Sequence, residues 1–300
     1  MTGHLRRTVG AALALLPLLA SGCGRLGFET ITDGGETDVD AGLRDAAILD
    51  AWRADDAGHD AATSPDASCV LVSSSCNEVH GLPAAPTIDG VIEPCLALNA
   101  VTPAGWTGSM ALPAAIHARA AYAWRPDGIY VYVEVDDPDR HPASMPDDPY
   151  CGDAVEAYVD DDGLFATPGS YDVPGTIQLI AAAPSSSTGS SSYAGRWVDT
   201  GTHVAWAPPR FAMVGRPGGY AFETLVQASE LGRASWTLTA GQHVGLDLAI
   251  DVSTPDGSLG TSPNSCGSRT GQYFLRIDPT AASCVDPYCD SRAFCTPVLR

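Results

Sequence analysis

Two runs in the middle of the chain alternate apolar and polar side chains. Residues 128–137 read GIYVYVEVDD and residues 153–162 read DAVEAYVDDD. A period of two places alternate side chains on opposite faces of an extended strand. Each run therefore predicts a strand with one face in an apolar core. The core-facing residues would be Ile129, Val131, Val133 and Val135 in the first run, and Val155, Ala157 and Val159 in the second.

Other runs are also short, rich in Val, Ile, Tyr and Phe, and bounded by Gly, Pro, Ser and Asp. They cover residues 115–124, 175–183, 219–227, 243–252 and 271–277. Many short strands separated by turn residues are typical of sandwiches and barrels. The sequence predicts an all-β fold, an antiparallel β-sandwich of immunoglobulin or jelly-roll type. We expect it to form a single domain over residues 69–300, after a disordered tether.

The second face of each central strand carries tyrosines and carboxylates. It is either a solvated outer face or the floor of a ligand groove, and alternation leaves both interpretations open.

The carboxylates of the second run do not have the spacing of a catalytic pair. Glu156 and Asp160 lie four residues apart, about 13 Å along a strand. A glycosidase needs two carboxyl groups about 5 to 9.5 Å apart, and neither G-x-S-x-G nor H-E-x-x-H occurs. We therefore expect a protein that is not an enzyme and needs no cofactor, with calcium binding left open.

The amino terminus has the features of an export signal. Arg6 and Arg7 precede an apolar run at residues 11–20 that is too short to span a bilayer. The following LLASGC resembles the lipobox of bacterial lipoproteins, which implies cleavage before Cys23 and a lipid on that cysteine. We expect residues 1–22 to be the signal peptide. The mature protein would be anchored to a membrane of the bacterial cell envelope, facing the periplasm or the exterior.

Residues 23–68 are dominated by Asp, Ala and Gly, a composition that predicts an acidic, disordered tether. The whole chain carries a formal net charge of −20. Such a charge repels nucleic acid and anionic membrane surfaces. Neutral ligands, cations and other proteins remain as partners, and the sequence does not name a protein partner.

The cysteines agree with export. Without Cys23, eight of the nine cysteines remain, an even number in a compartment where disulfides persist. The spacings lack the paired C-x2-C knuckles of a structural zinc site. Disulfides are therefore the favoured interpretation.

Five motifs follow one another along the chain: IDGVIEPC (88–95), GIYVYVEVDDPD (128–139), PYCGDAVEAYVDDDG (149–163), GYAFETLVQASELG (219–232) and GQHVGLDLAIDV (241–252). In this order they resemble the motifs of the family 9 carbohydrate-binding domain and its relatives. The resemblance covers roughly residues 86 to 277. It implies a β-sandwich that, in sugar-binding members, holds the end of a glycan between two aromatic rings. Carboxylate and amide side chains grip the sugar hydroxyls in those members.

The resemblance also implies site residues. Glu156 matches the carboxylate that binds sugar hydroxyls, and Tyr150 stands where the first stacking tryptophan would be. Gln178 and Asn264 lie near the amide contacts. Tyr158, on the face of Glu156, completes the expected carbohydrate-binding set.

Two positions depart from the family pattern. Cys95 replaces the aromatic residue after IDG, and Cys266 replaces the second clamp tryptophan. If the family backbone is kept, the loops carrying Cys151 and Cys266 lie close together, so we predict a Cys151–Cys266 disulfide across the clamp. Asp153 is expected to hold its loop rather than touch ligand.

These inferences favour a non-catalytic cell-surface lipoprotein that binds a glycan end or polysaccharide. The alternative is a structural or protein-interaction surface lipoprotein that kept the sandwich and lost the sugar clamp. A haem-binding relative of the same sandwich is a third interpretation, although no Met/His pair stands out in the sequence.

Overall fold

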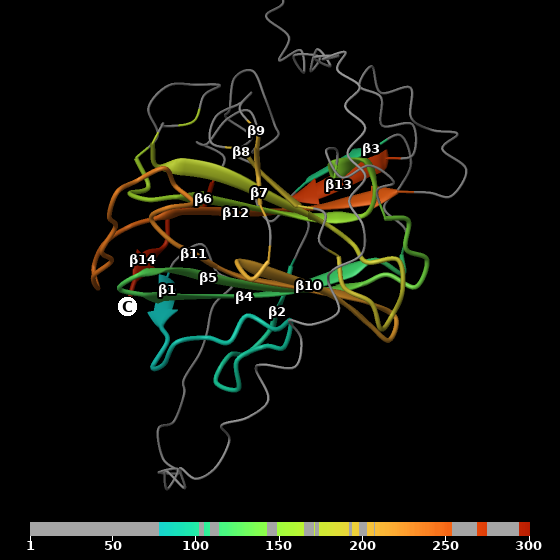
Figure 1. Ribbon diagram of the computed structural model, residues 1–300, viewed down its shortest axis with the longest axis horizontal. Coiled ribbons are helices and arrows are strands. Elements are labelled where there is room, and N and C mark those ends of the chain that lie inside the picture. Colours follow the sequence, from blue (N-terminus) through green and yellow to red (C-terminus); the bar gives the residue numbers. More distant parts are fainter. Residues whose placement is uncertain are drawn as a thin grey trace, which may run out of the picture.

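The protein folds into two sheets that pack face to face, as the computed structural model shows (Figure 1). The structure describes residues 78–101, 105–108, 114–142, 149–164, 171, 174–191, 194–197, 203–206, 208–253, 269–274 and 294–300. The predicted signal peptide, Cys23 and the tether at residues 23–68 lie outside these residues and stay predictions. No helix in the described part of the chain is long and apolar enough to cross a membrane.

The first sheet has the order β10-β11-β5-β4-β1-β14, with β2 paired to β4. Its strands are β1 (Glu78–Gly81), β2 (Asn99–Ala100), β4 (His117–Arg125), β5 (Gly128–Asp136), β10 (Phe211–Arg216), β11 (Gly219–Val226) and β14 (Val298–Leu299). Most neighbours are antiparallel, but β1 pairs in parallel with both β4 and β14.

The second sheet has the order β3-β13-β12-β6-β7-β8-β9, and every pair in it is antiparallel. Its strands are β3 (Gly105–Gly108), β6 (Ala154–Asp160), β7 (Thr176–Ala182), β8 (Ala194–Trp197), β9 (His203–Ala205), β12 (Gly245–Ser253) and β13 (Arg269–Phe274). Among the described residues, the single turn of 3-10 helix at Pro149–Cys151 is the only helix. The predicted all-β, antiparallel sandwich is confirmed, with the parallel pairing of β1 as an exception.

The core lies between the sheets and is built by the alternation in the sequence. The aliphatic residues of β5 and β6 that were expected to face inward are all 0% exposed and belong to one apolar cluster. Burial of a valine- or isoleucine-sized side chain contributes about 1.5 to 3 kcal/mol. The predicted sidedness of both strands is confirmed.

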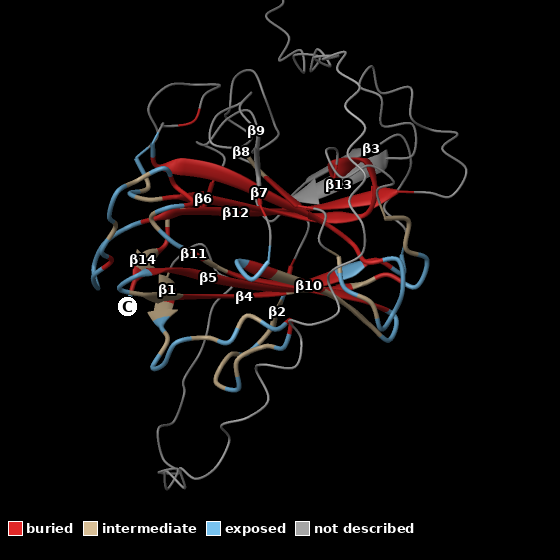
Figure 2. Cartoon of the chain, in the orientation of Figure 1, coloured by how far each residue is buried: buried red, intermediate tan, exposed pale blue. Residues whose placement is uncertain are grey.

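Much of the outer face of the central strands is shielded from solvent, although Glu134 and Asp136 near the end of β5 are only partly buried. Tyr132 on β5 is 2% exposed, and Glu156 on β6 is 1% exposed. Figure 2 shows buried residues continuing along the central strands of both sheets. The interpretation of these faces as open to solvent is wrong at the buried positions, where other parts of the chain pack on them.

Residues 82–98 cover the outer face of the first sheet. The apolar side chains of this cover pack against Tyr130, Tyr132 and Ala221; they belong to Leu82, Ile88, Ile92, Leu96 and Leu98. Such a cover removes the tyrosine rings from water without adding a strand to the sheet. No periodic pattern predicts this cover, because its apolar residues are irregularly spaced.

One buried carboxylate fixes this cover. Glu223 on β11 accepts hydrogen bonds from the backbone N–H groups of Asp89 and Gly90, at 2.8 and 2.7 Å, and from the Tyr130 hydroxyl at 2.6 Å. Burial raises the pKa of Glu223. Gly90 has a φ of +85°, and a Cβ there would lie 2.4 Å from Val214 Cγ2. The IDG and GYAFE motifs, far apart in sequence, therefore form a single contact.

The carboxyl-terminal segment connects the two sheets at one end. Cys295 and Leu246 exchange two backbone hydrogen bonds, each 2.8 Å long. Further along, the N–H of Arg300 donates to the Val79 carbonyl, and the N–H of Gly81 donates to the Arg300 carbonyl. The last residues thus run from β12 of the second sheet to β1 of the first.

Candidate functional site

Three of the predicted site residues meet on the outer face of the second sheet. Glu156 and Tyr158 lie on β6, and Gln178 lies on β7. The Tyr158 hydroxyl donates to the Glu156 carboxylate. The Gln178 side-chain amide donates to Glu156 Oε2 at 3.0 Å and to the Tyr158 oxygen at 3.1 Å. We call these three residues the Glu156 cluster.

Strand geometry explains why these residues meet. Glu156 and Tyr158 are two residues apart and so share a face, and Gln178 is the direct partner of Tyr158 across the antiparallel pair. Burial raises the pKa of Tyr158, and the Glu156 charge raises it further. The phenol therefore stays protonated and serves as a hydrogen-bond donor to the carboxylate.

Two aromatic rings lie next to the Glu156 cluster. The ring of Phe294 lies 5.5 Å from that of Tyr158 and 6.3 Å from that of Tyr171, measured between centroids, and both pairs are tilted. Phe294 is 2% exposed and Tyr171 is 6% exposed. Sequence reasoning missed both rings, since neither stands in an alternating run or in a motif of the family resemblance.

Tyr150 lies beside the Glu156 cluster rather than within it. It belongs to the 3-10 turn Pro149–Cys151, is 8% exposed, and packs in a small apolar cluster with Cys151, Ala154 and Ile180. Ile180 pairs directly opposite Glu156. The structure therefore places Tyr150 on the same outer face, as a packed ring.

The remaining sequence predictions concern Cys151, Asn264 and Cys266. Asn264 and Cys266 lie outside the described residues. Cys151 is disulfide-bonded, as are Cys95 and Cys295. The Cys151–Cys266 pairing stays a prediction, as does the place of Asn264 in the site.

Asp153 holds the loop that precedes β6, in agreement with its expected role. Its carboxylate accepts the backbone N–H of Ser253 at 2.6 Å and also that of His141. Its own N–H donates to the His141 carbonyl at 2.8 Å. Burial raises the pKa of Asp153, and the charge of Asp137 raises it further. Burial also raises the pKa of Asp137, a residue to which sequence reasoning assigned no role.

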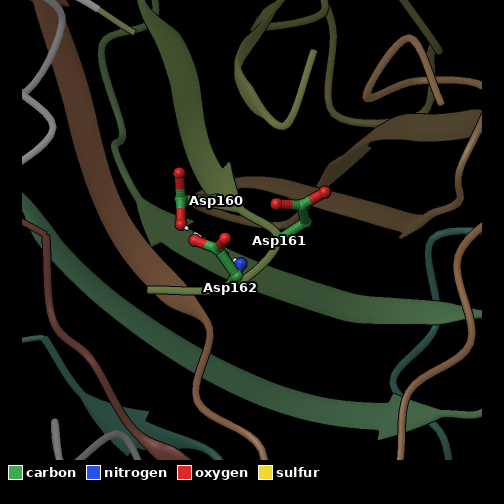
Figure 3. Close-up of side chains that lie close together, drawn as sticks. All are labelled: Asp160, Asp161 and Asp162. Atoms are coloured by element: carbon green, nitrogen blue, oxygen red, sulfur yellow. Dashed lines mark hydrogen bonds between the residues drawn. The ribbon is translucent and has the colours of Figure 1, made fainter. Parts of the chain in front are cut away.

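Three consecutive carboxylates, Asp160, Asp161 and Asp162, end β6 with oxygen atoms within 4.8 Å of one another (Figure 3). Asp160 stabilises the turn that follows β6. It accepts hydrogen bonds from the Gly163 N–H at 2.7 Å and from the Thr176 hydroxyl at 2.5 Å. Burial raises the pKa of Asp160 to about 6. This group is the place in the described chain where the open question of calcium arises.

The other two carboxylates have partners as well. Arg233 donates to both oxygens of Asp161, with Nη2 to Oδ1 at 3.0 Å. Asp162 Oδ1 accepts the backbone N–H of Leu164 at 2.8 Å. These contacts account for the positions of all three carboxylates as parts of a turn and an ion pair.

Fold and cluster together define a β-sandwich domain with a buried hydrogen-bonding cluster on one outer face. The family model described as carbohydrate family 9 binding domain-like matches residues 88–262. The chain belongs to this family.

No curated protein matches the chain significantly. A family 9 carbohydrate binding module from Caldicellulosiruptor kristjanssonii, solved with cellotriose, is 17% identical, with 75% of this chain and 94% of that chain covered and a TM-score of 0.49. A structure titled as a family 9 module from the same organism in complex with glucose is 17% identical, covering 75% of this chain and 96% of that chain, with a TM-score of 0.48.

Proposed function

We propose that this protein is a non-catalytic carbohydrate-binding protein whose polar contacts to sugar come from the Glu156 cluster. The observation that carries the proposal is the meeting of Glu156, Tyr158 and Gln178 in a member of a carbohydrate-binding family. A carboxylate accepts hydrogen bonds from neighbouring sugar hydroxyls, and an amide both donates and accepts. Each such bond contributes about 1 kcal/mol.

The ligand of this proposal is a neutral saccharide. The formal net charge of −20 disfavours acidic glycans by long-range repulsion. The ring of Tyr158, beside the polar groups, offers apolar surface for the C–H side of a pyranose. Cellotriose and glucose, the ligands named for the two solved family 9 modules, are suitable first probes.

The proposed place of action is the outside of a bacterial membrane. The basis is the signal-like sequence that ends at Cys23 and the acidic residues 23–68 that follow it. A lipid on Cys23 would hold the chain, and a flexible tether of this length would reach on the order of 35 to 40 Å. The Cys23→Ser variant should stay uncleaved or leave the membrane fraction, whereas unchanged detergent-dependent attachment would exclude the lipid.

Titration calorimetry on the whole mature chain tests sugar binding. Glu156→Gln should weaken binding of a neutral oligosaccharide at least about tenfold, because the lost charge-assisted bonds contribute about 1.5 to 3 kcal/mol. The matched control is Glu134→Gln, which changes a carboxylate on β5 of the other sheet that pairs with Arg119 at 2.7 Å. Equal binding by the wild type and Glu156→Gln would show that the sugar-binding site lies elsewhere in the protein.

A second candidate function is that of a structural or protein-interaction surface protein. The burial of the whole Glu156 cluster favours it, since buried groups are not presented to a ligand. A glycan array separates the two candidates. If neither the wild type nor a Phe294→Ala variant binds any glycan, the carbohydrate proposal is wrong and the second candidate replaces it.

A further inference from the structure

The Glu156 cluster is closed by an aromatic residue from the end of the same chain. We infer that Phe294 controls the access of carbohydrate to this cluster, so that a sugar binds only after the Phe294 ring has moved away. The inference rests on the proposed function and adds a regulatory contact to it. Neither the strand pattern nor the family motifs point to Phe294.

The geometry of the rings leaves no room for a ligand between them. A sugar that stacks between two rings has atoms about 3.5 to 4.0 Å from each ring, which requires about 7 to 8 Å between the rings. The centroids of Phe294 and Tyr158 are only 5.5 Å apart. Phe294 therefore occupies the position that a pyranose would take over Tyr158.

The closed arrangement also uses the polar groups that a sugar would need. Glu156 accepts hydrogen bonds from both Tyr158 and Gln178, and all three side chains are more than nine-tenths buried. A sugar hydroxyl that binds Oε2 of Glu156 competes with these two donors. Side-chain donors can turn aside for a ligand without breaking a strand pair, so the cluster can change partners once its apolar cover is gone.

The attachment of Phe294 suggests how it can move. The next residue, Cys295, is disulfide-bonded and exchanges two 2.8 Å backbone hydrogen bonds with Leu246. Beyond it, β14 pairs with β1. Because the backbone is fixed on this side of Phe294, the ring can swing outward while the carboxyl-terminal segment stays in place.

The size of the effect follows from the apolar surface that opening exposes. Moving a buried phenylalanine into water costs an amount that corresponds to an affinity change of about tenfold to a hundredfold. In a protein whose binding-competent state is a minor one, the apparent affinity falls by the populated fraction. Removing the Phe294 ring should therefore raise the apparent affinity for sugar by that factor.

The test compares the wild type with Phe294→Ala and Phe294→Leu in the whole mature chain. Calorimetry with cellotriose should give binding about tenfold to a hundredfold tighter for Phe294→Ala than for the wild type, with Phe294→Leu between them. Leu164→Ala is the matched control, since Leu164 is 70% exposed and an apolar truncation there should change nothing.

Hydroxyl-radical footprinting with mass spectrometry measures access without a sugar. Tyr158 and Tyr171 should be oxidised faster in Phe294→Ala than in the wild type. Tyr122 and Tyr220, which lie in the core between the sheets, should stay protected in both proteins and so report that the variant is folded. If they lose protection in Phe294→Ala, the same two measurements on Phe294→Leu decide the question.

The outcomes separate this inference from the proposed function. Unchanged protection of Tyr158 in the folded variants, or equal cellotriose affinity in the wild type and Phe294→Ala, overturns the role of Phe294. In the second case the carbohydrate proposal stands if binding still depends on Glu156. Faster oxidation of Tyr158 with no binding by any variant overturns the carbohydrate proposal and leaves Phe294 as the residue that closes this face.

Discussion

The two outer faces of the sandwich bury the same kinds of residue but hold them by different hydrogen bonds. On the first sheet, Glu223 lies beside Tyr130 under the cover at residues 82–98. On the second sheet, Glu156 lies beside Tyr158 under Phe294. Each face thus combines a buried carboxylate, a tyrosine hydroxyl that donates to it, and an apolar layer above.

The difference lies in the donors. Glu223 accepts two backbone N–H groups of the cover, so losing the carboxylate leaves the buried Gly90 N–H and the part-buried Asp89 N–H without this acceptor. The hydrogen bonds described for Glu156 come from the side chains of Tyr158 and Gln178, which also bond each other. A carboxylate held by backbone fixes a structure, whereas one held by side chains can exchange its partners for a ligand.

The largest expected effect breaks the first face. Glu223→Ala should lower the free energy of unfolding by about 3 to 5 kcal/mol, because each buried donor left unsatisfied costs about 1 to 3 kcal/mol. Urea denaturation measures the loss. Tyr130→Phe, which removes one hydroxyl donor and keeps the ring, is the control and should cost about 1 kcal/mol. A loss for Glu223→Ala no larger than that of the control would show that the carboxylate does not hold the cover.

A smaller effect comes from the turn under which Glu223 lies. Gly90→Ala should cost about 3 kcal/mol, since its positive φ adds strain and its Cβ would overlap the Val214 side chain. Gly218 is a matched control: its φ is +76°, but a Cβ there would meet nothing within 4 Å. Gly218→Ala should therefore cost only about 1 kcal/mol. Equal losses in the two variants would mean that the cover can shift away from β10.

Asp160, a structural carboxylate on the second sheet, should make the stability of the protein depend on pH. Burial raises the pKa of Asp160 from its ordinary value of 3.8 to about 6. A raised folded-state pKa stabilises the protein below the unfolded-state value, and that stabilisation is lost as the pH rises through about 6. Between pH 4 and pH 7 the loss from this group is about 2 kcal/mol.

Thermal unfolding at a series of pH values tests this prediction. Asp160→Asn should flatten the decline between pH 4 and pH 7. Part of the slope should remain, because burial also raises the pKa values of Asp137, Asp153 and Glu223. An unchanged slope in the variant would assign the pH dependence to those carboxyls instead.

The sequence predicted the sandwich and the sidedness of its strands because both follow from a period of two. Val131 and Val155 are buried between the sheets as the alternation requires. The same alternation said nothing of what lies on the other side, since Ile88 and Phe294 belong to segments without a period. A buried outer face is a tertiary property of loops.

The candidate site shows the same division. A family resemblance pointed to Glu156 and Gln178, and the register between β6 and β7 places their side chains within hydrogen-bonding distance. The closure of that site by Phe294 depends on a contact between residues 136 positions apart in the chain, Tyr158 and Phe294. Glu223 lies inside a recognised motif, but its role in holding the cover depends on a hydrogen bond from the distant Gly90 N–H, which the motif does not predict.

The smallest expected effect sharpens the comparison of the two faces. Glu156→Ala should lower the free energy of unfolding by only about 1 kcal/mol, because the Tyr158 hydroxyl and the Gln178 amide, 3.1 Å apart, can still pair with each other. Glu156→Ala and Glu223→Ala make the same chemical change on the two faces, and urea denaturation compares the stability that each variant loses. If Glu156→Ala costs as much as Glu223→Ala, Glu156 is as structural as Glu223. A small loss combined with lost sugar binding would instead mark Glu156 as a residue kept for a ligand, at little cost to stability.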